Sequence, residues 1–222
     1  MLVFDVECIP LAASMAEPYP EEERTPPGNY KSEEAIAKWR AADREKWDAE
    51  RVKAYSLSPR TGRVVCIGYG NTDGDSHAQL AKVEADEYAL LCGFWKLVRQ
   101  SPVIVGFNSH GFDFPFLLIR SLILGVEPGV RVADYLRRYT YTPHFDVRMA
   151  LTGWDVRQPG TLADWAKAFG VAGKSGHGSE VYGMVLEGRW DDLSNYCLAD
   201  VAVTRALAER VGPAYGVEVA DA

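Results

Sequence analysis

Apolar and polar positions follow one another along the chain in a way that predicts an α/β domain. Short apolar runs bounded by turn residues predict strands, and longer amphipathic runs predict helices. The predicted strands cover residues 2–6, 63–70, 78–83 and 102–107. The predicted helices cover residues 85–99 and 111–124, and two or three more fill the C-terminal half, the last at 193–211. Because strands come first and then alternate with helices, we expect a mixed sheet.

One segment departs from this pattern, at residues 19–62. Residues 19–30 carry Pro, Glu and Gly without an apolar period and predict a loop. Residues 32–55 predict a charged helix with only a thin apolar stripe. The balance of ten Lys or Arg and nine Asp or Glu within 21–63 is typical of a solvated surface. We therefore expect one domain over residues 1–222 that contains a helical insertion.

The insertion joins the first predicted strand to the second, so its two ends should lie close to the acids of the first strand. We expect this helix to act as a lid or a guide beside those acids, with basic side chains such as Lys46, Arg51 and Lys53 on phosphate groups of the ligand. The alternative is a passive helix held to the domain by Trp39 and Trp47.

Composition narrows the class of protein. The 222 residues are 47% hydrophobic and 25% charged, which are ordinary globular values. No apolar run reaches the length of a membrane span and the N-terminus lacks a signal peptide's basic start, so we expect a cytoplasmic protein without membrane association. The net charge of −7 argues against a long duplex footprint, because phosphate-binding proteins are usually basic. This charge favours a short contact with one end of a nucleic-acid strand over a long contact with a duplex.

The cysteines do not predict a metal site. Cys8, Cys66, Cys92 and Cys197 show no Cys-x-x-Cys spacing, and the four His do not cluster with them. We expect buried thiols in a reducing compartment.

Two glycine-rich stretches imitate nucleotide-binding loops. GVAGKS at 170–175 lacks the glycine that a P-loop needs five residues before Gly173, where Ala168 stands. GYGNTDG at 68–74 misses the dinucleotide-binding spacing by one residue. We expect both stretches to be turns.

Three acidic motifs carry the candidate chemistry. Asp5 and Glu7 lie two apart at the end of a buried strand, so both side chains point to one face. Asp113 begins a helix after a buried strand, within GFNSHGFDFPFL. Tyr196 and Asp200 lie one turn apart on a helix. Hydrolysis of a phosphodiester by two metal ions needs such carboxylates to converge from different elements. Taken alone, Asp113 could equally be an aspartate that stabilises the start of a helix. Asp200 taken alone could be a solvated acid beside a tyrosine of the core.

Together, the order and spacing of these motifs resemble DEDDy-type 3′-5′ exonucleases. The motifs are Phe4-Asp5-Val6-Glu7, then Asn108 through Phe112-Asp113, then Tyr196-x-x-x-Asp200. The chain is most similar to the proofreading exonuclease domain of family B DNA polymerases and its stand-alone bacterial relatives. The resemblance covers most of residues 1–10 and 63–211. It implies an RNase H-like fold, a five-stranded mixed sheet flanked by helices.

The resemblance also implies roles for the site residues. Two ions, Mg²⁺ or Mn²⁺, would be held by Asp5, Glu7, Asp113 and Asp200, with Asp5 between them. Tyr196 would orient the attacking water. The substrate would be a single-stranded 3′ end, DNA in preference to RNA, and the product a nucleoside 5′-monophosphate. The sequence names no protein partner.

Four further residues are candidates for substrate binding. By the same resemblance Asn108, Phe112 and Arg120 would grip the terminal nucleotides, Phe112 by stacking. Cys8 stands where the family commonly has Thr or Ser beside the terminal sugar, so a backbone contact would survive there and a hydroxyl contact would not.

Two other interpretations stay open. One is an RNase D-like exoribonuclease, although no feature of the sequence indicates recognition of a ribose 2′-hydroxyl. The other is an inactive RNase H-like module that binds nucleic acid. Such a module is expected to have lost a ligand, whereas all four acids and Tyr196 are present.

Overall fold

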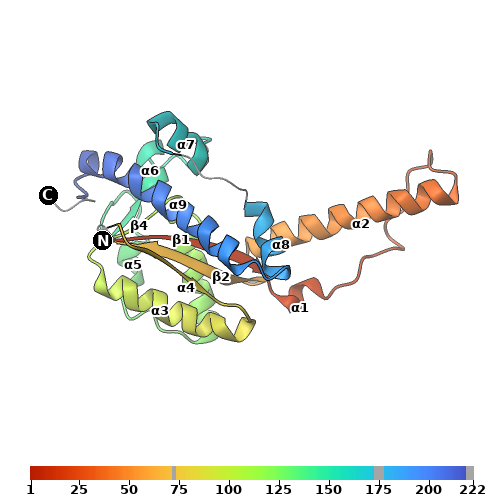
Figure 1. The fold of residues 1–222 in the computed structure, drawn as a ribbon, viewed down its shortest axis with the longest axis horizontal. Coiled ribbons are helices and arrows are strands. Elements are labelled where there is room, and N and C mark those ends of the chain that lie inside the picture. The colour runs from red at the N-terminus through yellow and green to blue at the C-terminus, as the bar shows by residue number, and fades with distance from the viewer. Residues whose placement is uncertain (72–73, 173–177, 219–222) are drawn as a thin grey trace.

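Five strands form one mixed sheet in the order β3-β2-β1-β4-β5 in the computed structural model, which describes residues 1–71, 74–172 and 178–218 (Figure 1). The strands are β1 (Leu2–Pro10), β2 (Gly62–Gly70), β3 (Ser76–Leu80), β4 (Ile104–Gly106) and β5 (His144–Asp146). β1, β2 and β3 pair antiparallel, whereas β4 pairs parallel with both β1 and β5. The mixed sheet that we predicted is confirmed.

Helices cover both faces of this sheet (Figure 1). One face packs against α3 (Glu87–Gln100) and α4 (Asp113–Leu124). The other packs against the C-terminal helices α6 (Val147–Thr152), α7 (Leu162–Phe169), α8 (Val181–Leu186) and α9 (Trp190–Val211). Shorter pieces are α1 (Ala12–Met15), α5 (Val132–Tyr135) and 3₁₀ turns at Glu84–Asp86, Gly178–Glu180 and Gly212–Tyr215. None of the described helices has both the length and the apolar character that a membrane span needs.

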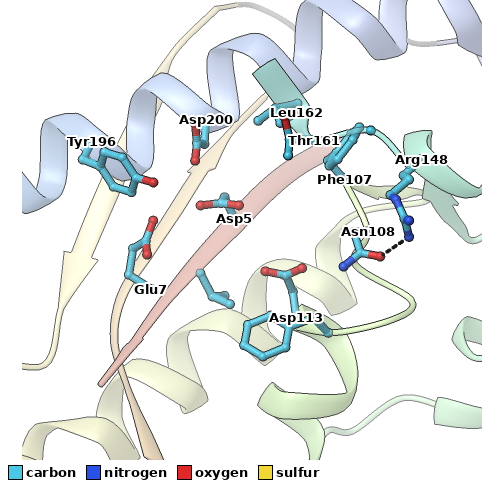
Figure 2. A pocket seen from close by; sticks show the side chains of 13 residues that line it. Asp5, Glu7, Phe107, Asn108, Asp113, Arg148, Thr161, Leu162, Tyr196 and Asp200 are labelled. Carbon is cyan, nitrogen blue, oxygen red and sulfur yellow. Dashed lines mark hydrogen bonds between the residues drawn. The ribbon is translucent and has the colours of Figure 1, made fainter. Parts of the chain in front are cut away.

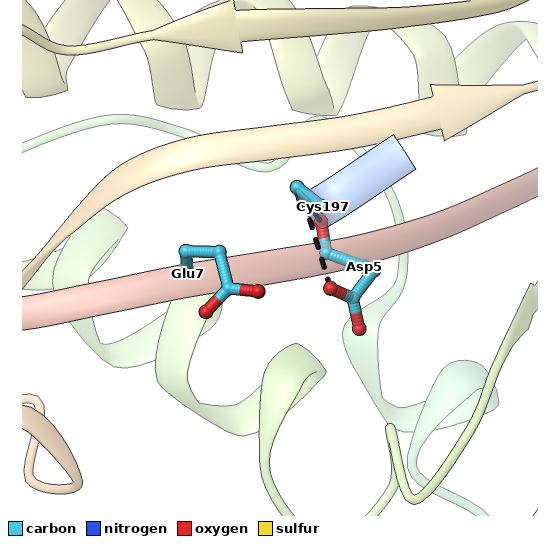
Figure 3. A group of neighbouring side chains, drawn as sticks. All are labelled: Asp5, Glu7 and Cys197. Carbon is cyan, nitrogen blue, oxygen red and sulfur yellow. Dashed lines mark hydrogen bonds between the residues drawn. The ribbon is translucent and has the colours of Figure 1, made fainter. Parts of the chain in front are cut away.

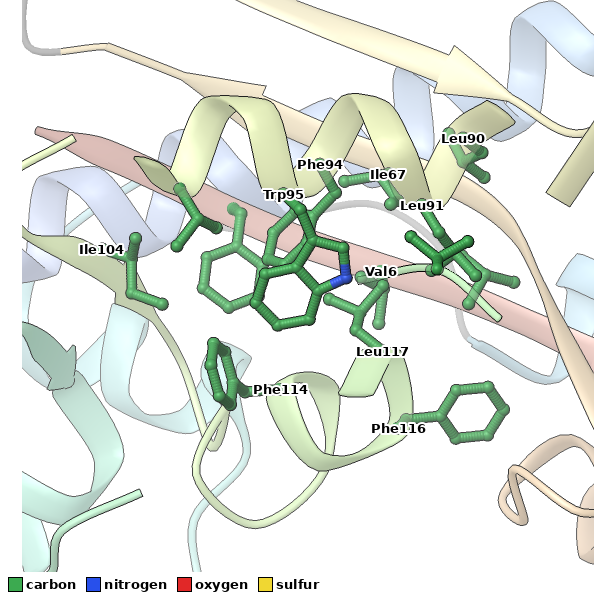
Figure 4. Close-up of a cluster of buried hydrophobic side chains, with 14 of the residues drawn as sticks. Val6, Ile67, Leu90, Leu91, Phe94, Trp95, Ile104, Phe114, Phe116 and Leu117 are labelled. Carbon is green, nitrogen blue, oxygen red and sulfur yellow. The ribbon is translucent and has the colours of Figure 1, made fainter. Parts of the chain in front are cut away.

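The side chains on the two sides of β1 belong to two different core clusters. Phe4 and Val6 pack with the aromatic residues of α3 and α4, among them Phe94, Trp95 and Phe114 (Figure 4). Val3 packs on the opposite side. This alternation follows from the period of two in a strand, and it directs the odd-numbered acids toward α9.

Helix α2 (Glu33–Ser56) is the predicted charged helix, and most of it projects away from the sheet (Figure 1). Ser32 caps its first turn by accepting from the N–H of Ala35. The preceding loop is fastened along it, since Tyr19 and Arg24 both donate to the carboxylate of Asp43. The division of the chain, one domain over residues 1–222 with an insertion at residues 19–62, stays a prediction.

The sequence misplaced or missed some elements. β1 runs four residues past its predicted end, and β3 begins and ends earlier than predicted. β5 was missed, because three residues are too few for an alternating pattern and their extended form depends on pairing with β4. Residues 68–70 belong to β2 and not to a turn, whereas residues 72–73 of GYGNTDG and 173–175 of GVAGKS lie outside the described part of the chain.

Candidate active site

Asp5 and Glu7 lie on the face of β1 that α9 covers, opposite Phe4 and Val6. A β-bulge follows directly after Glu7, where the register between β1 and β2 shifts. Bulges bend a strand and change the direction of its side chains. Both carboxylates line one cavity of about 450 Å³ (Figure 2).

Helix α9 brings Tyr196 and Asp200 to the same cavity (Figure 2). The two side chains are four residues apart and therefore share a helix face. They are 7% and 6% exposed. The helix can approach the sheet because β2 carries Gly68, where a Cβ would stand 2.8 Å from the Sγ of Cys197.

Cys197 contacts Asp5 from the helix side. Its Sγ lies 3.6 Å from both the carbonyl oxygen and Oδ2 of Asp5 (Figure 3). A hydrogen bond with Cys66 and burial raise the pKa of this thiol well above its usual range, so it stays protonated and donates. The four cysteines form no disulfide; Cys66 and Cys197 are buried as expected, whereas Cys8 and Cys92 are only partly buried. The orientation of Asp5 by Cys197 was not predicted.

Asp113 enters the cavity from the opposite side, as the first residue of α4 (Figure 2). The loop before it turns sharply at Asn108, whose φ of 59° lies in the left-handed region that asparagine tolerates better than most residues. The N–H groups of Gly111 and Phe112 both donate to the Asn108 carbonyl, at 3.0 Å. Local turn geometry thus fixes where the helix, and its first carboxylate, begins.

A buried aspartate that we did not predict holds this loop from below. Asp146, 1% exposed, ends β5 and accepts from the N–H groups of Asn108 and His110 at 2.9 and 2.8 Å. It also caps α6 by accepting from the N–H groups of Arg148 and Met149. Four backbone donors therefore depend on one carboxylate. The strand that carries Asp146 was not predicted, and this role was therefore not predicted either.

His144 fixes the same loop through Ser109. Burial lowers the pKa of His144 well below its usual range, so the ring is neutral. Its Nδ1 donates to the Tyr135 carbonyl, 3.0 Å away, because a carbonyl can only accept. Its Nε2 must then accept from the Ser109 hydroxyl at 2.8 Å.

The four carboxylates fit a divalent metal site. Asp5, Glu7, Asp113 and Asp200 come from three elements and line one cavity. Burial, with the charges of Asp146 and Asp200, raises the pKa of Asp113 to about 7. Cations favour the ionised form of such a group, and hard cations prefer oxygen ligands. This donor set suits magnesium or manganese better than softer metals.

The raised pKa of Asp113 predicts a pH-dependent stability of the metal-free protein. An unfolded aspartate has a pKa near about 4, so between about pH 4 and 7 the folded state binds more protons. The free energy of unfolding should therefore fall as pH rises through this window. We expect the melting temperature in EDTA to drop more between pH 5 and 7.5 in the wild type than in Asp113→Asn. Parallel curves for the two proteins would contradict the raised pKa.

The predicted substrate-binding residues are only partly brought together. Asn108 and Phe112 line the cavity, where the side-chain oxygen of Asn108 accepts from Arg148 at 2.9 Å (Figure 2). Arg148 lines it as well and was not predicted. Cys8 instead lines an adjoining groove beyond Glu7.

Arg120 does not lie in the cavity, contrary to the sequence expectation. It is 3% exposed and donates from Nε and Nη2 to the two carboxylate oxygens of Glu87, at 2.9 and 2.6 Å. It also donates to the carbonyl of Pro59. A guanidinium paired in this way joins α4 to α3 and has no open face for a nucleotide.

A protein-family model matches residues 57–211, well over half of the chain, and describes a predicted 3′-5′ exonuclease related to the exonuclease domain of PolB. The chain belongs to this family. The family match includes Asp113, Tyr196 and Asp200, whereas Asp5, Glu7 and α2 precede it.

The other two comparisons match DNA polymerases. DNA polymerase 2 of Aeropyrum pernix is 27% identical over 185 residues, 76% of this chain and 23% of the polymerase. The family B DNA polymerase of Pyrobaculum calidifontis has a similar structure, with a TM-score of 0.62 and 24% identity over 96% of this chain and 24% of that one. The structural likeness supports the RNase H-like fold. The chain spans about a quarter of the length of either polymerase.

Proposed function

We propose that this chain is a metal-dependent 3′-5′ exonuclease that releases nucleoside 5′-monophosphates from single-stranded DNA ends. The observation that carries the proposal is the convergence of four carboxylates and one tyrosine on a single cavity, in a member of an exonuclease family. The cavity opens to the surface, and the end of a nucleic-acid strand needs such access.

Asp5, Glu7 and Asp200 would hold one ion, and Asp5 with Asp113 the second. Divalent cations bound there would supply an activated water as nucleophile and would stabilise the charge on the departing 3′ oxygen. The Cys197 thiol lies against the Asp5 carboxylate and would help to orient it. Asn108 and Arg148 form a polar edge of the cavity that suits a phosphate oxygen or a sugar hydroxyl.

The direct test uses matched single-stranded DNA and RNA of one sequence, labelled at the 5′ or the 3′ end. We expect immediate release of a labelled mononucleotide from the 3′ label and a descending ladder from the 5′ label, with Mg²⁺ or Mn²⁺ and not with EDTA. Faster digestion of RNA would favour the RNase D-like alternative. Binding without cleavage of either strand by any divalent metal would favour the inactive module.

Tyr196 is proposed to orient the attacking water through its hydroxyl. Tyr196→Phe removes that hydroxyl and keeps the ring that packs beside Val181 and Leu193. We expect a 10- to 1000-fold lower single-turnover rate, roughly the effect of one oriented hydrogen bond at a reacting centre. The affinity for DNA, measured by fluorescence anisotropy with Ca²⁺, should change little. Tyr88→Phe, at an exposed position, is the control. A Tyr196→Phe rate equal to that of the control would assign Tyr196 to packing alone.

A further inference from the structure

A second, more apolar cavity of about 680 Å³ adjoins the acidic one, and α2 forms one of its walls. We call it the α2 groove. Its other walls come from β1, at Glu7 and Cys8, and from α8, at Tyr182. In Figure 1 the C-terminal end of α2 meets α8 and the end of β1, while the rest of the helix points outward. The groove thus lies at the root of the projecting helix.

The α2 groove is continuous with the candidate active site. Val6, Glu7 and Phe112 line both cavities. A strand end whose phosphate lies at the carboxylates therefore has a direct path into the groove, past the ring of Phe112.

The wall that α2 contributes is firmly held. Arg51 is 7% exposed and donates to the carbonyls of Glu17 and Ser14, at 2.9 and 3.0 Å. Its guanidinium also lies over the ring of Trp47, 4.1 Å from the ring centre. Arg51 is therefore not the phosphate contact that the sequence indicated; it anchors the root of the helix.

The lining has the chemistry of a nucleobase site. Phe112 and Tyr182 supply aromatic rings, and Val52 and Leu57 supply apolar surface, with Leu57 56% exposed. Lys53, exposed on α2, is the cation of the described lining. Flat bases stack on such surfaces, and an ammonium group attracts the adjoining phosphate.

We infer that the root of α2 is part of the substrate site. The α2 groove holds a nucleobase at the strand end, packed against Val52 and Leu57, and Lys53 attracts a phosphate of the same strand. The inference rests on the proposed exonuclease function and assigns a substrate contact to a helix that precedes the matched family segment.

The first test fills the groove. Val52→Trp places a large ring in it, and Ala42→Trp adds the same ring at an exposed position on the same helix, outside the groove. Substrates are single-stranded DNA with an abasic residue at the last or the next-to-last position, each compared with the intact strand. Wild type and Ala42→Trp should prefer the intact strand to at least one abasic strand by about tenfold in kcat/KM, within the range of one base stack. Val52→Trp should lose this preference, mainly through KM.

The second test does not depend on repacking. Lys53→Glu and Lys38→Glu make the same charge change at two exposed positions of α2, and only Lys53 lines the groove. The plot of log kcat/KM against log salt has a negative slope, and Lys53→Glu should make that slope shallower by roughly one, the effect of one lost phosphate contact. Lys38→Glu should leave the slope as in the wild type.

The outcomes separate this inference from the proposed function. Circular dichroism establishes that each variant is folded. If the wild type degrades DNA with Mg²⁺ and both groove variants keep the wild-type base preference and salt slope, the inference is wrong and the exonuclease proposal stands. If the wild type degrades no strand with any divalent metal, the exonuclease proposal is wrong, and the inference about the α2 groove falls with it.

Discussion

Asp5→Ala is expected to lower exonuclease activity by roughly 1000-fold or more, because the carboxylate common to both proposed ion sites is removed. The same change should abolish most of the rise in melting temperature that Mg²⁺ or Mn²⁺ produces in the wild type. A ligand that binds only the folded state stabilises it by mass action, and that gain requires the ligating side chains.

The matched control is Asp191→Ala, which removes an exposed carboxylate from the first turn of α9. It should keep both the activity and the thermal response to metal. If Asp5→Ala keeps the thermal response of the wild type, Asp5 is not a metal ligand, whatever its effect on the rate. Metal-free Asp5→Ala should be at least as stable as the wild type, since one of four crowded negative charges is gone.

How far the sequence predicts the site depends on whether a residue acts through local or long-range structure. Asp5 and Glu7 share a face because of the period of a strand, and Tyr196 and Asp200 because of the period of a helix. Both relations are local, and both are present in the structure. Their convergence with Asp113 was inferred from the order of motifs and not from any single segment.

Arg120 illustrates the opposite case. Its position after a motif indicated a nucleotide contact, but its partner Glu87 is an acid of a helix whose pattern alone predicts exposure. A buried ion pair between two helices depends on how they pack against each other on the sheet, and that packing has no signature in either segment. The burial of Arg51 at the root of α2 escaped prediction for the same reason.

Helix α2 could be predicted in part. Its helical state and its charged surface were predicted, and its root beside Glu7 follows from the pairing of β1 with β2 at its two ends. The α2 groove could not be predicted, because it also needs α8 and Phe112, which come from distant parts of the chain.

Asp146→Ala is expected to have the largest effect on stability of any single change at the site. The substitution leaves four backbone N–H groups without their acceptor: that of Met149 is buried, and those of Asn108, His110 and Arg148 are partly buried. An unsatisfied buried donor costs about 1–3 kcal/mol, although water entering the space would offset part of the sum. A net loss of about 3–5 kcal/mol would lower the melting temperature by roughly 6–20 °C in a chain of this size.

The same change should also weaken the metal response, because the loop that Asp146 holds leads directly to Asp113. Asp146→Asn keeps one acceptor oxygen and should fall between the wild type and Asp146→Ala in both measurements. The control is Asp155→Ala, which breaks an ion pair with Arg157 at the surface and should move the melting temperature little. The decisive comparison is calorimetry of the three variants with and without Mn²⁺. If Asp146→Ala has the same melting temperature as Asp155→Ala, the carboxylate of Asp146 does not support the loop. The position of Asp113 must then depend on Ser109 and His144 instead.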